Sequence, residues 1–176
     1  MIRQQRLRVE LPVVLALGSN LGDREGTLRD AVHAISRIDG VTVEAASSIV
    51  QTPAVTLSGV DHSAPAYLNA VVYARSALEP HALLDQLQRI EAEHGRVRGE
   101  RWGDRTLDID IVAFAHVQVN DDRLTIPHPR VADRAFVLVP WLQLDPGATV
   151  AGLGRASDLL ANIENDATEF EAEPLW

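Results

Sequence analysis

Short apolar runs alternate with stretches of helical period along this chain, and the alternation predicts a mixed α/β protein. An apolar run at residues 13–17 predicts a first strand, which the turn residues Gly18-Ser19-Asn20 are expected to end. Apolar side chains then recur every three or four positions, which predicts a helix that begins near Asp23 and ends at Asp39-Gly40. Its expected buried stripe consists of Leu28, Ala31, Val32, Ile35 and Ile38.

Strand-like apolar runs and helical spacing continue through the middle of the chain. Strands are predicted at residues 41–51 and 67–74, separated at residues 52–65 by a loop that contains Pro, Gly, Ser and Asp. Pro80 suits the first position of a second helix because its missing N–H would be unpaired there anyway. Gly95 suits the position just past the end of that helix.

The order of the elements indicates a fold class. Strict alternation at residues 107–114 predicts a fourth strand, followed by a hairpin at residues 116–125 and short helices at residues 132–144 and 157–163. The core order β-α-β-β-α-β is the ferredoxin-like pattern of an α+β fold, in which helices pack on an antiparallel sheet.

Domain organisation follows from length and from where the pattern ends. A chain of 176 residues, of which 46% are hydrophobic and 23% charged, is large enough to bury one core. We predict a single domain at residues 12–163, an N-terminal extension at residues 1–11 and an acidic C-terminal tail at residues 164–176. The first residues carry only a short apolar run, so neither a signal peptide nor a membrane span is expected. A cytoplasmic monomer is predicted.

Two aspartates occupy alternate positions of the fourth predicted strand. Alternation directs Leu107, Ile109 and Ile111 into the core, and it directs Asp108 and Asp110 together to the other face, with Cα atoms about 6.6 Å apart. Carboxylates at that spacing can hold one Mg²⁺ or bridge a pair, with phosphate oxygens as further ligands. An isolated Asp-x-Asp pair is more often the solvated face of a strand. Here the depletion of Asp in strands and the repulsion of like charges favour a cation site.

Arginines gather immediately before that strand. Arg96, Arg98, Arg101 and Arg105 fall within ten residues. The dipole at a helix C-terminus would account for Arg96 and Arg98, whereas Arg101 and Arg105 lie too far from the expected helix end. Guanidinium forks beside metal-binding carboxylates are the components of a nucleotide polyphosphate site. Trp102 either covers a base or anchors the loop.

Two further groupings carry chemistry. Tyr67 and Asn69 share a face of the third predicted strand, where a ring and a carboxamide can stack on a flat heterocycle and bind its edge. His128 lies between two prolines that stiffen the chain, and it could donate to a phosphate oxygen, as could Arg134. Phe136 could supply a second aromatic face. Taken alone, each grouping is at least as compatible with a structural role.

Composition narrows the ways in which phosphate could be bound. All 16 basic residues are arginines, so the chain lacks the lysine of a P-loop and that of a Schiff-base enzyme. The absence of cysteine excludes thiolate nucleophiles, zinc–thiolate sites, iron–sulfur clusters and disulfides. The net charge is −9, but six acids and no base lie within residues 157–176. The acidity is therefore expected to lie in a tail away from the chemistry, while the arginine cluster indicates a specific anion site.

In their order, these motifs resemble the 6-hydroxymethyl-7,8-dihydropterin pyrophosphokinase family of folate biosynthesis. The resemblance spans roughly residues 13–145 and is most specific at Arg101-Trp102-Gly103-Asp104-Arg105-Thr106-Leu107-Asp108-Ile109-Asp110. The other matching pieces are Gly18-Ser19-Asn20-Leu21, Tyr67-Leu68-Asn69-Ala70, Gly95-Arg96-Val97-Arg98 and Ile126-Pro127-His128-Pro129. One departure is Asp104, which stands where the family usually has proline or a small residue.

The resemblance implies a ferredoxin-like fold and transfer of a pyrophosphoryl group from ATP to the hydroxymethyl oxygen of the pterin, with release of AMP. It implies ATP as co-substrate and two Mg²⁺ ions, which Asp108 and Asp110 would hold. The residues that would form the pterin pocket are Thr52, Pro53, Val55, Tyr67, Asn69 and Phe136. Those that would lie around ATP are Glu91, Arg98, Arg101, Trp102, Ile111, Arg123, Thr125, His128 and Arg134, while Arg96 and Arg105 would act on the phosphate chain in the reacting state.

Two alternatives from other classes stay open at this point. An RNA-binding module of the same fold would need aromatic residues on two central strands and a basic sheet face, whereas Asp108 and Asp110 make that face acidic. A non-catalytic ligand-sensing domain would not need the aspartate pair. We therefore expect pterin and ATP as small-molecule partners, and neither nucleic acid nor a membrane.

Overall fold

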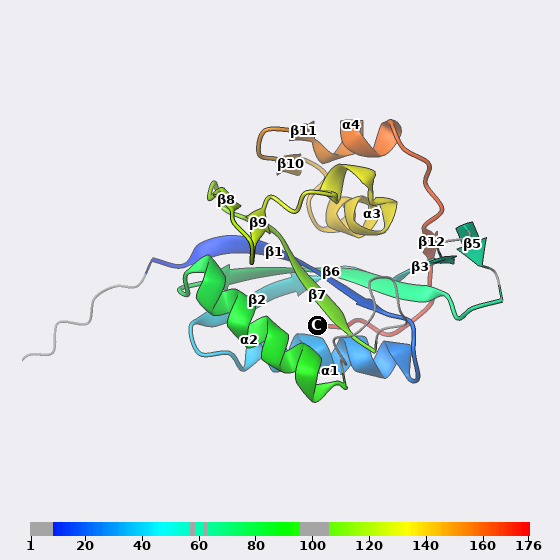
Figure 1. The fold of residues 1–176 in the computed structure, drawn as a ribbon, viewed down its shortest axis with the longest axis horizontal. Helices are drawn as coiled ribbons and strands as arrows, with labels where there is room; N and C mark the ends of the chain where they lie inside the picture. The colour runs from blue at the N-terminus through cyan, green and yellow to red at the C-terminus, as the bar shows by residue number, and fades with distance from the viewer. Residues whose placement is uncertain (1–8, 57–58, 62, 96–105) are drawn as a thin grey trace, which may run out of the picture.

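An antiparallel sheet forms the middle layer of the molecule (Figure 1). The computed structural model describes residues 9–56, 59–61, 63–95 and 106–176. Neighbouring strands follow the order β12-β3-β6-β1-β7, and β2 also pairs with β6. The bounds of these strands are β1 (Leu11–Ser19), β2 (Val41–Ala46), β3 (Val50–Thr52), β6 (Tyr67–Ser76), β7 (Asp108–Phe114) and β12 (Thr168–Glu169).

Helices cover both faces of this sheet. One layer consists of α1 (Arg24–Ser36) and α2 (Pro80–Glu93), and the other contains α3 (Ala135–Leu144) and α4 (Ala156–Ala161), as Figure 1 shows. The main core lies under α1 and α2, and a second cluster lies under α3. The main core includes Leu15, Leu17, Leu28, Ile35, Leu83, Leu87, Ile109 and Ile111, whereas the second includes Val71, Val112, Leu138 and Trp141. Alternate residues of the central strands thus enter different cores.

Both predicted helix starts are confirmed. The Asp23 side chain accepts a hydrogen bond from the Gly26 backbone N–H at 3.0 Å, which satisfies one of the unpaired donors at the start of α1. Pro80 occupies the first turn of α2. Gly95 follows the end of α2 with φ of 80°, a left-handed conformation in which glycine has no steric penalty.

Three strand predictions were wrong in their limits. The first strand includes Gly18 and Ser19, so these residues extend β1 instead of ending it in a turn. The predicted strand at residues 41–51 is divided into β2 and β3, because Ser47 turns the chain: its hydroxyl accepts from the Val71 N–H, and its own N–H donates to the Val71 carbonyl. The predicted loop at residues 52–65 contains a small hairpin of β4 (Ala54–Thr56) and β5 (Gly59–Asp61).

The second half of the chain follows the prediction more closely. The expected hairpin is formed by β8 (Val119–Asn120) and β9 (Thr125–Ile126). The helix predicted at residues 132–144 consists of a 3₁₀ turn, η1 (Val131–Asp133), and α3, which are separated by the extended residue Arg134. The last helix is α4, and before it lies a hairpin of β10 (Thr149–Val150) and β11 (Gly154–Arg155).

Residues 164–176, predicted as an acidic C-terminal tail, dock on the sheet and on the main core. Within this segment β12 pairs with β3, and Leu175 is only 2% exposed and belongs to the main core. Backbone pairing and one buried leucine hold the segment in place, while its acidic side chains stay exposed and keep their solvation. Among the described residues, no helix has the length and apolar character needed to span a membrane.

Candidate functional site

Three neighbouring strands form the floor of the candidate site. In the register of the sheet, Gly18 of β1 lies opposite Asn69 of β6 on one side and opposite Asp108 of β7 on the other. Ala16 of β1 lies opposite Asp110 in the same way. The antiparallel pairing therefore brings residues from three distant segments to one face, while Leu17 and Ile109 enter the core on the other face.

Small side chains keep this floor open. A Cβ atom on Gly18 would lie 3.0 Å from Oδ1 of Asn69, so any larger residue would displace the carboxamide. Gly18 and Ala16 both line the large cavity above the floor. Sequence analysis did not predict this role. Two small residues at alternate positions of a strand whose other residues are mostly larger could have indicated it.

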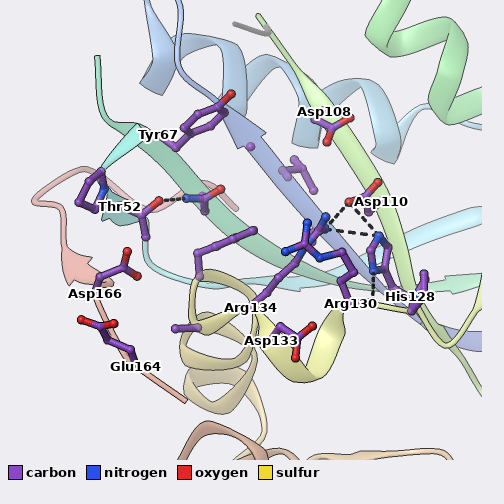
Figure 2. A pocket seen from close by; sticks show the side chains of 18 residues that line it. Thr52, Tyr67, Asp108, Asp110, His128, Arg130, Asp133, Arg134, Glu164 and Asp166 are labelled. Carbon is purple, nitrogen blue, oxygen red and sulfur yellow. Dashed lines mark hydrogen bonds and ion pairs between the residues drawn. The ribbon is translucent and has the colours of Figure 1, made fainter. Parts of the chain in front are cut away.

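The cavity has a volume of about 590 Å³ and brings together two of the predicted groups of residues (Figure 2). The predicted pterin contacts that line it are Thr52, Pro53, Tyr67, Asn69 and Phe136, and the other predicted site residues that line it are Asp108, Asp110, His128 and Arg134. In Figure 2, Tyr67 and Thr52 lie at one end, and Asp110, His128 and Arg134 lie at the other. At the Thr52 end, Asn69 Nδ2 donates to Thr52 Oγ1 at 3.2 Å, which orients the carboxamide.

Arg134 contacts both Asp110, a candidate metal ligand, and the aromatic ring of Phe136. Its Nη1 donates to Asp110 Oδ2 at 2.9 Å and lies 3.4 Å from His128 Nε2. Its guanidinium carbon lies 5.5 Å from the centroid of the Phe136 ring, within range of a cation–π contact. The extended conformation between η1 and α3 places Arg134 where it makes all three contacts.

His128 is held as a neutral ring in this network. Burial lowers the pKa of His128 below its usual value, and the nearby positive charges of Arg134 and Arg130 act in the same direction against the carboxylates of Asp110 and Asp108. The Arg130 backbone N–H donates to Nδ1 at 3.1 Å, so the ring proton is assigned to Nε2, which lies 3.5 Å from Asp110 Oδ2. The site therefore offers a neutral N–H donor beside a carboxylate.

The donor set on β7 fits a hard divalent cation. Asp108 and Asp110 are half-buried on the cavity side of β7, and carboxylate oxygens are the ligands that Mg²⁺ prefers. In the described part of the chain, no three or more His, Asp and Glu side chains form a complete protein-only metal site. Two carboxylates fit the mode in which Mg²⁺ keeps water and takes its other ligands from substrate phosphates.

A second cavity of about 300 Å³ meets the first at Asp110, His128 and Pro129, which line both. Among the residues that it adds are four predicted ATP contacts, Glu91, Ile111, Arg123 and Thr125. Arg123 is exposed and forms an ion pair with Asp85. The described pterin residues thus line the first cavity, whereas the predicted ATP residues are shared: Arg134 lines the first cavity, His128 lines both, and the other four line the second.

Glu91 has a contact that sequence analysis did not anticipate. It is 3% exposed, and its Oε1 accepts a hydrogen bond from the Ile109 backbone N–H at 2.8 Å. Ile109 lies between Asp108 and Asp110, so the carboxylate on α2 holds the β7 backbone from which both aspartates project.

Several predicted site residues lie outside the described part of the structure: Arg96, Arg98, Arg101, Trp102 and Arg105. Val55 belongs to β4, and its side chain lies outside the described part as well. The cavity also has lining residues that sequence analysis did not select as contacts, namely Arg130, Asp133, Glu164 and Asp166. The last two belong to residues 164–176, which sequence analysis expected to lie away from the chemistry, and the structure places them at this cavity.

Comparison with known proteins gives consistent results for most of the chain. The model of a family described as 7,8-dihydro-6-hydroxymethylpterin-pyrophosphokinase (HPPK) matches residues 14–146. A 2-amino-4-hydroxy-6-hydroxymethyldihydropteridine pyrophosphokinase of Methylorubrum extorquens is 42% identical over 138 residues, which cover 78% of this chain and 85% of that protein. Its counterpart in Mycobacterium tuberculosis is 41% identical over 165 residues, covering 86% and 84%.

The fold is also similar to solved structures. A crystal structure of wild-type Plasmodium falciparum HPPK-DHPS with pterin and p-hydroxybenzoate superposes with a TM-score of 0.65 at 15% identity. The match covers 92% of this chain and 46% of that one, so this chain spans less than half of the longer protein. At this identity the likeness concerns the fold alone.

Proposed function

This chain belongs to the 7,8-dihydro-6-hydroxymethylpterin-pyrophosphokinase (HPPK) family, and from that premise we propose how its two cavities hold the two substrates. The chain is an ATP-dependent diphosphokinase that transfers a pyrophosphoryl group to 6-hydroxymethyl-7,8-dihydropterin in folate biosynthesis. The observation that carries the proposal is the shared boundary of the cavities, where Asp110 and His128 line both.

The pterin binds in the large cavity at the end formed by Thr52, Tyr67 and Asn69. Tyr67 and Phe136 supply the aromatic faces for the flat ring, and Asn69 binds its edge. The hydrogen bond from Asn69 to Thr52 supports this assignment because it fixes the carboxamide before the substrate arrives. Pro53 and Val55 complete the pocket.

ATP binds in the second cavity, with its phosphates directed to the shared boundary. Glu91, Ile111, Arg123 and Thr125 line that cavity, and His128 and Arg134 meet the phosphates beside Asp110. Asp108 and Asp110 would hold two Mg²⁺ ions, whose positive charge would help to neutralise the phosphates. From residues 96–105, we propose that Arg98, Arg101 and Trp102 contact ATP, and that Arg96 and Arg105 act on the phosphate chain in the reacting state.

Catalysis by these residues consists of orientation and of stabilising charge. The β-phosphorus of ATP is already electrophilic, so the enzyme must hold the pterin hydroxyl in line with it and keep water out. The Arg134 guanidinium and the His128 N–H lie where negative charge spreads over the phosphate oxygens during transfer.

The proposal extends to the organisation of the chain. The strand order β3-β6-β1-β7 and its antiparallel pairing support a ferredoxin-like core. We assign residues 12–163, together with the docked segment 164–176, to one catalytic domain and residues 1–11 to an N-terminal extension. We propose a cytoplasmic monomer that binds neither nucleic acid nor membranes.

Formation of AMP tests the function directly. Purified protein with ATP, Mg²⁺ and 6-hydroxymethyl-7,8-dihydropterin is expected to release one AMP for each pterin diphosphate formed, and omission of the pterin is the control. Absence of AMP above that control at saturating substrates would contradict the function.

The assignment of the pterin end predicts the effect of Tyr67→Ala. Loss of one stacking face is worth about 1.4 kcal/mol, so the KM for the pterin should rise about tenfold while the KM for ATP stays within twofold. Steady-state kinetics with each substrate varied in turn measures both constants. An equal rise in both would show that Tyr67 does not distinguish the two substrates.

A further inference from the structure

Residues 164–176, which we call the strap, run from the α4 layer past the β3 edge of the sheet to the α1 layer (Figure 1). In the register of the sheet, Thr168 of β12 lies opposite Gln51 of β3. The Phe170 N–H then donates to the Ile49 carbonyl at 3.0 Å. The strap is therefore an added edge strand that continues across the molecule.

The far end of the strap is anchored on α1. Leu175 is 2% exposed and lies in the main core. Arg29 of α1 donates to the carbonyl oxygens of Pro174 at 2.6 Å and of Glu173 at 3.2 Å, and its own position is supported by an ion pair with Glu25. Burial of a leucine and two charge-assisted hydrogen bonds distinguish this segment from a solvated acidic tail.

The near end of the strap forms part of the large cavity. Glu164 and Asp166 line it together with Thr52. Figure 2 shows both carboxylates on the side of Thr52, away from Asp110 and His128. Because Thr52 is the last residue of β3, the strand that pairs with the strap, this pairing also sets where the two acids lie in the cavity.

The two ends of the cavity carry different charged groups. Arg130 and Arg134 lie at one end beside Asp110 and Asp133, and their guanidinium groups suit phosphate oxygens. Glu164 and Asp166 lie at the other end, where their carboxylates would repel phosphate and are able to accept hydrogen bonds. The amino-bearing ring edge of the pterin carries N–H donors at the exocyclic amino group and at N3, so the acidic end suits these groups and not the triphosphate.

We propose that the strap is a wall of the pterin site, in which Glu164 and Asp166 accept hydrogen bonds from the amino-bearing edge of the pterin. Leu175 and Arg29 are positioning residues: they hold the strap on α1 and act on the substrate only through it. The inference rests on the proposed assignment of the pterin to the Thr52 end of the cavity.

The first test removes the two charges and leaves the strap docked. The double variant Glu164→Gln/Asp166→Asn should raise the KM for the pterin about fivefold, with kcat and the KM for ATP within twofold of the wild type. The matched control Glu79→Gln/Asp158→Asn makes the same change of charge at exposed positions outside both cavities. An equal change in the pterin KM of both double variants would overturn the proposal.

The second test loosens the strap from outside the cavity. Leu175→Ala should raise the KM for the pterin about fivefold and speed hydrogen exchange at the Phe170 amide, without changing the KM for ATP. Arg29→Ala makes the same test without opening a core cavity, and Leu153→Ala at an exposed leucine is the control. Faster exchange at Phe170 with an unchanged pterin KM would overturn the proposal.

Measurements on the wild type and on Tyr67→Ala distinguish a failure of the strap proposal from a failure of the assignment of the pterin to the Thr52 end of the cavity. Suppose that the wild type forms AMP and that Tyr67→Ala raises the KM for the pterin. If the strap variants then keep the wild-type KM for the pterin, the strap proposal alone is overturned. An unaltered Tyr67→Ala variant would instead overturn the location of the pterin site, and the strap proposal with it.

Discussion

Replacing Asp110 with alanine is expected to lower kcat for AMP formation by about 10³-fold, because the variant loses a carboxylate from the proposed cation site. Asp108→Ala should have a similar effect. Asp110→Ala should be the more severe change because Asp110 also accepts the hydrogen bond from Arg134 at 2.9 Å. Steady-state AMP formation with Mg²⁺ varied at saturating ATP and pterin measures the loss.

The fold should survive both changes. Each side chain projects from the cavity face of β7, whereas Ile109 and Ile111 hold the strand in the core, so far-UV circular dichroism should stay native. Asp158→Ala on the exposed surface of α4 is the control for loss of an acidic side chain and should keep full activity. Full activity of both site variants would show that the cation site lies elsewhere.

Replacing Glu91 with alanine is expected to have the largest effect on stability among the site variants. The change leaves the buried Ile109 N–H without its acceptor, which costs about 2 kcal/mol. For a protein of this size, that cost corresponds to a fall in Tm of about 4–8 °C. The kcat should also fall, because Ile109 lies between the two aspartates and its backbone loses its support.

Glu91→Gln separates the two effects. The amide oxygen of glutamine can still accept from Ile109, so Tm should recover most of the loss seen with alanine. Thermal unfolding followed by circular dichroism, together with steady-state kinetics, measures both quantities. An alanine variant with wild-type Tm would show that this hydrogen bond does not support β7.

Much of the fold could be predicted from local pattern. The stripe of Leu83, Leu84, Leu87 and Ile90 repeats every three or four residues, and all four are buried in α2. Such signals are local, because one helix face and its caps are set by side chains within a few turns. The helix starts at Asp23 and Pro80 were predicted for the same reason.

The limits of strands were harder to predict because they depend on partners far along the chain. Gly18 and Ser19 resemble a turn locally, yet β1 continues through them because β6 pairs with both residues and β7 pairs with Gly18. Ser47 ends β2 through a hydrogen bond with Val71, which is 24 positions away. No local period contains that information.

For the candidate site, sequence analysis indicated which residues take part better than how they are arranged. Alternation placed Asp108 and Asp110 on one face, and both line the cavity as expected. The contact of Glu91 with Ile109 could not be predicted, because a glutamate on a helix has no visible partner in sequence. The roles proposed for Arg96 and Arg105 stay predictions.

The sequence by itself determined the chemistry that is available: arginine without lysine, no thiol, and two aspartates at alternate positions of a strand. Composition and period carry that information because they depend on single residues and near neighbours. Only the tertiary structure decided which distant segments of the chain meet at the cavity. It brought Glu164 and Asp166, which charge alone assigned to a distant tail, beside Thr52. The physical reason is that backbone pairing with β3 and burial of Leu175 stabilise a docked strap, and neither contact is local in sequence.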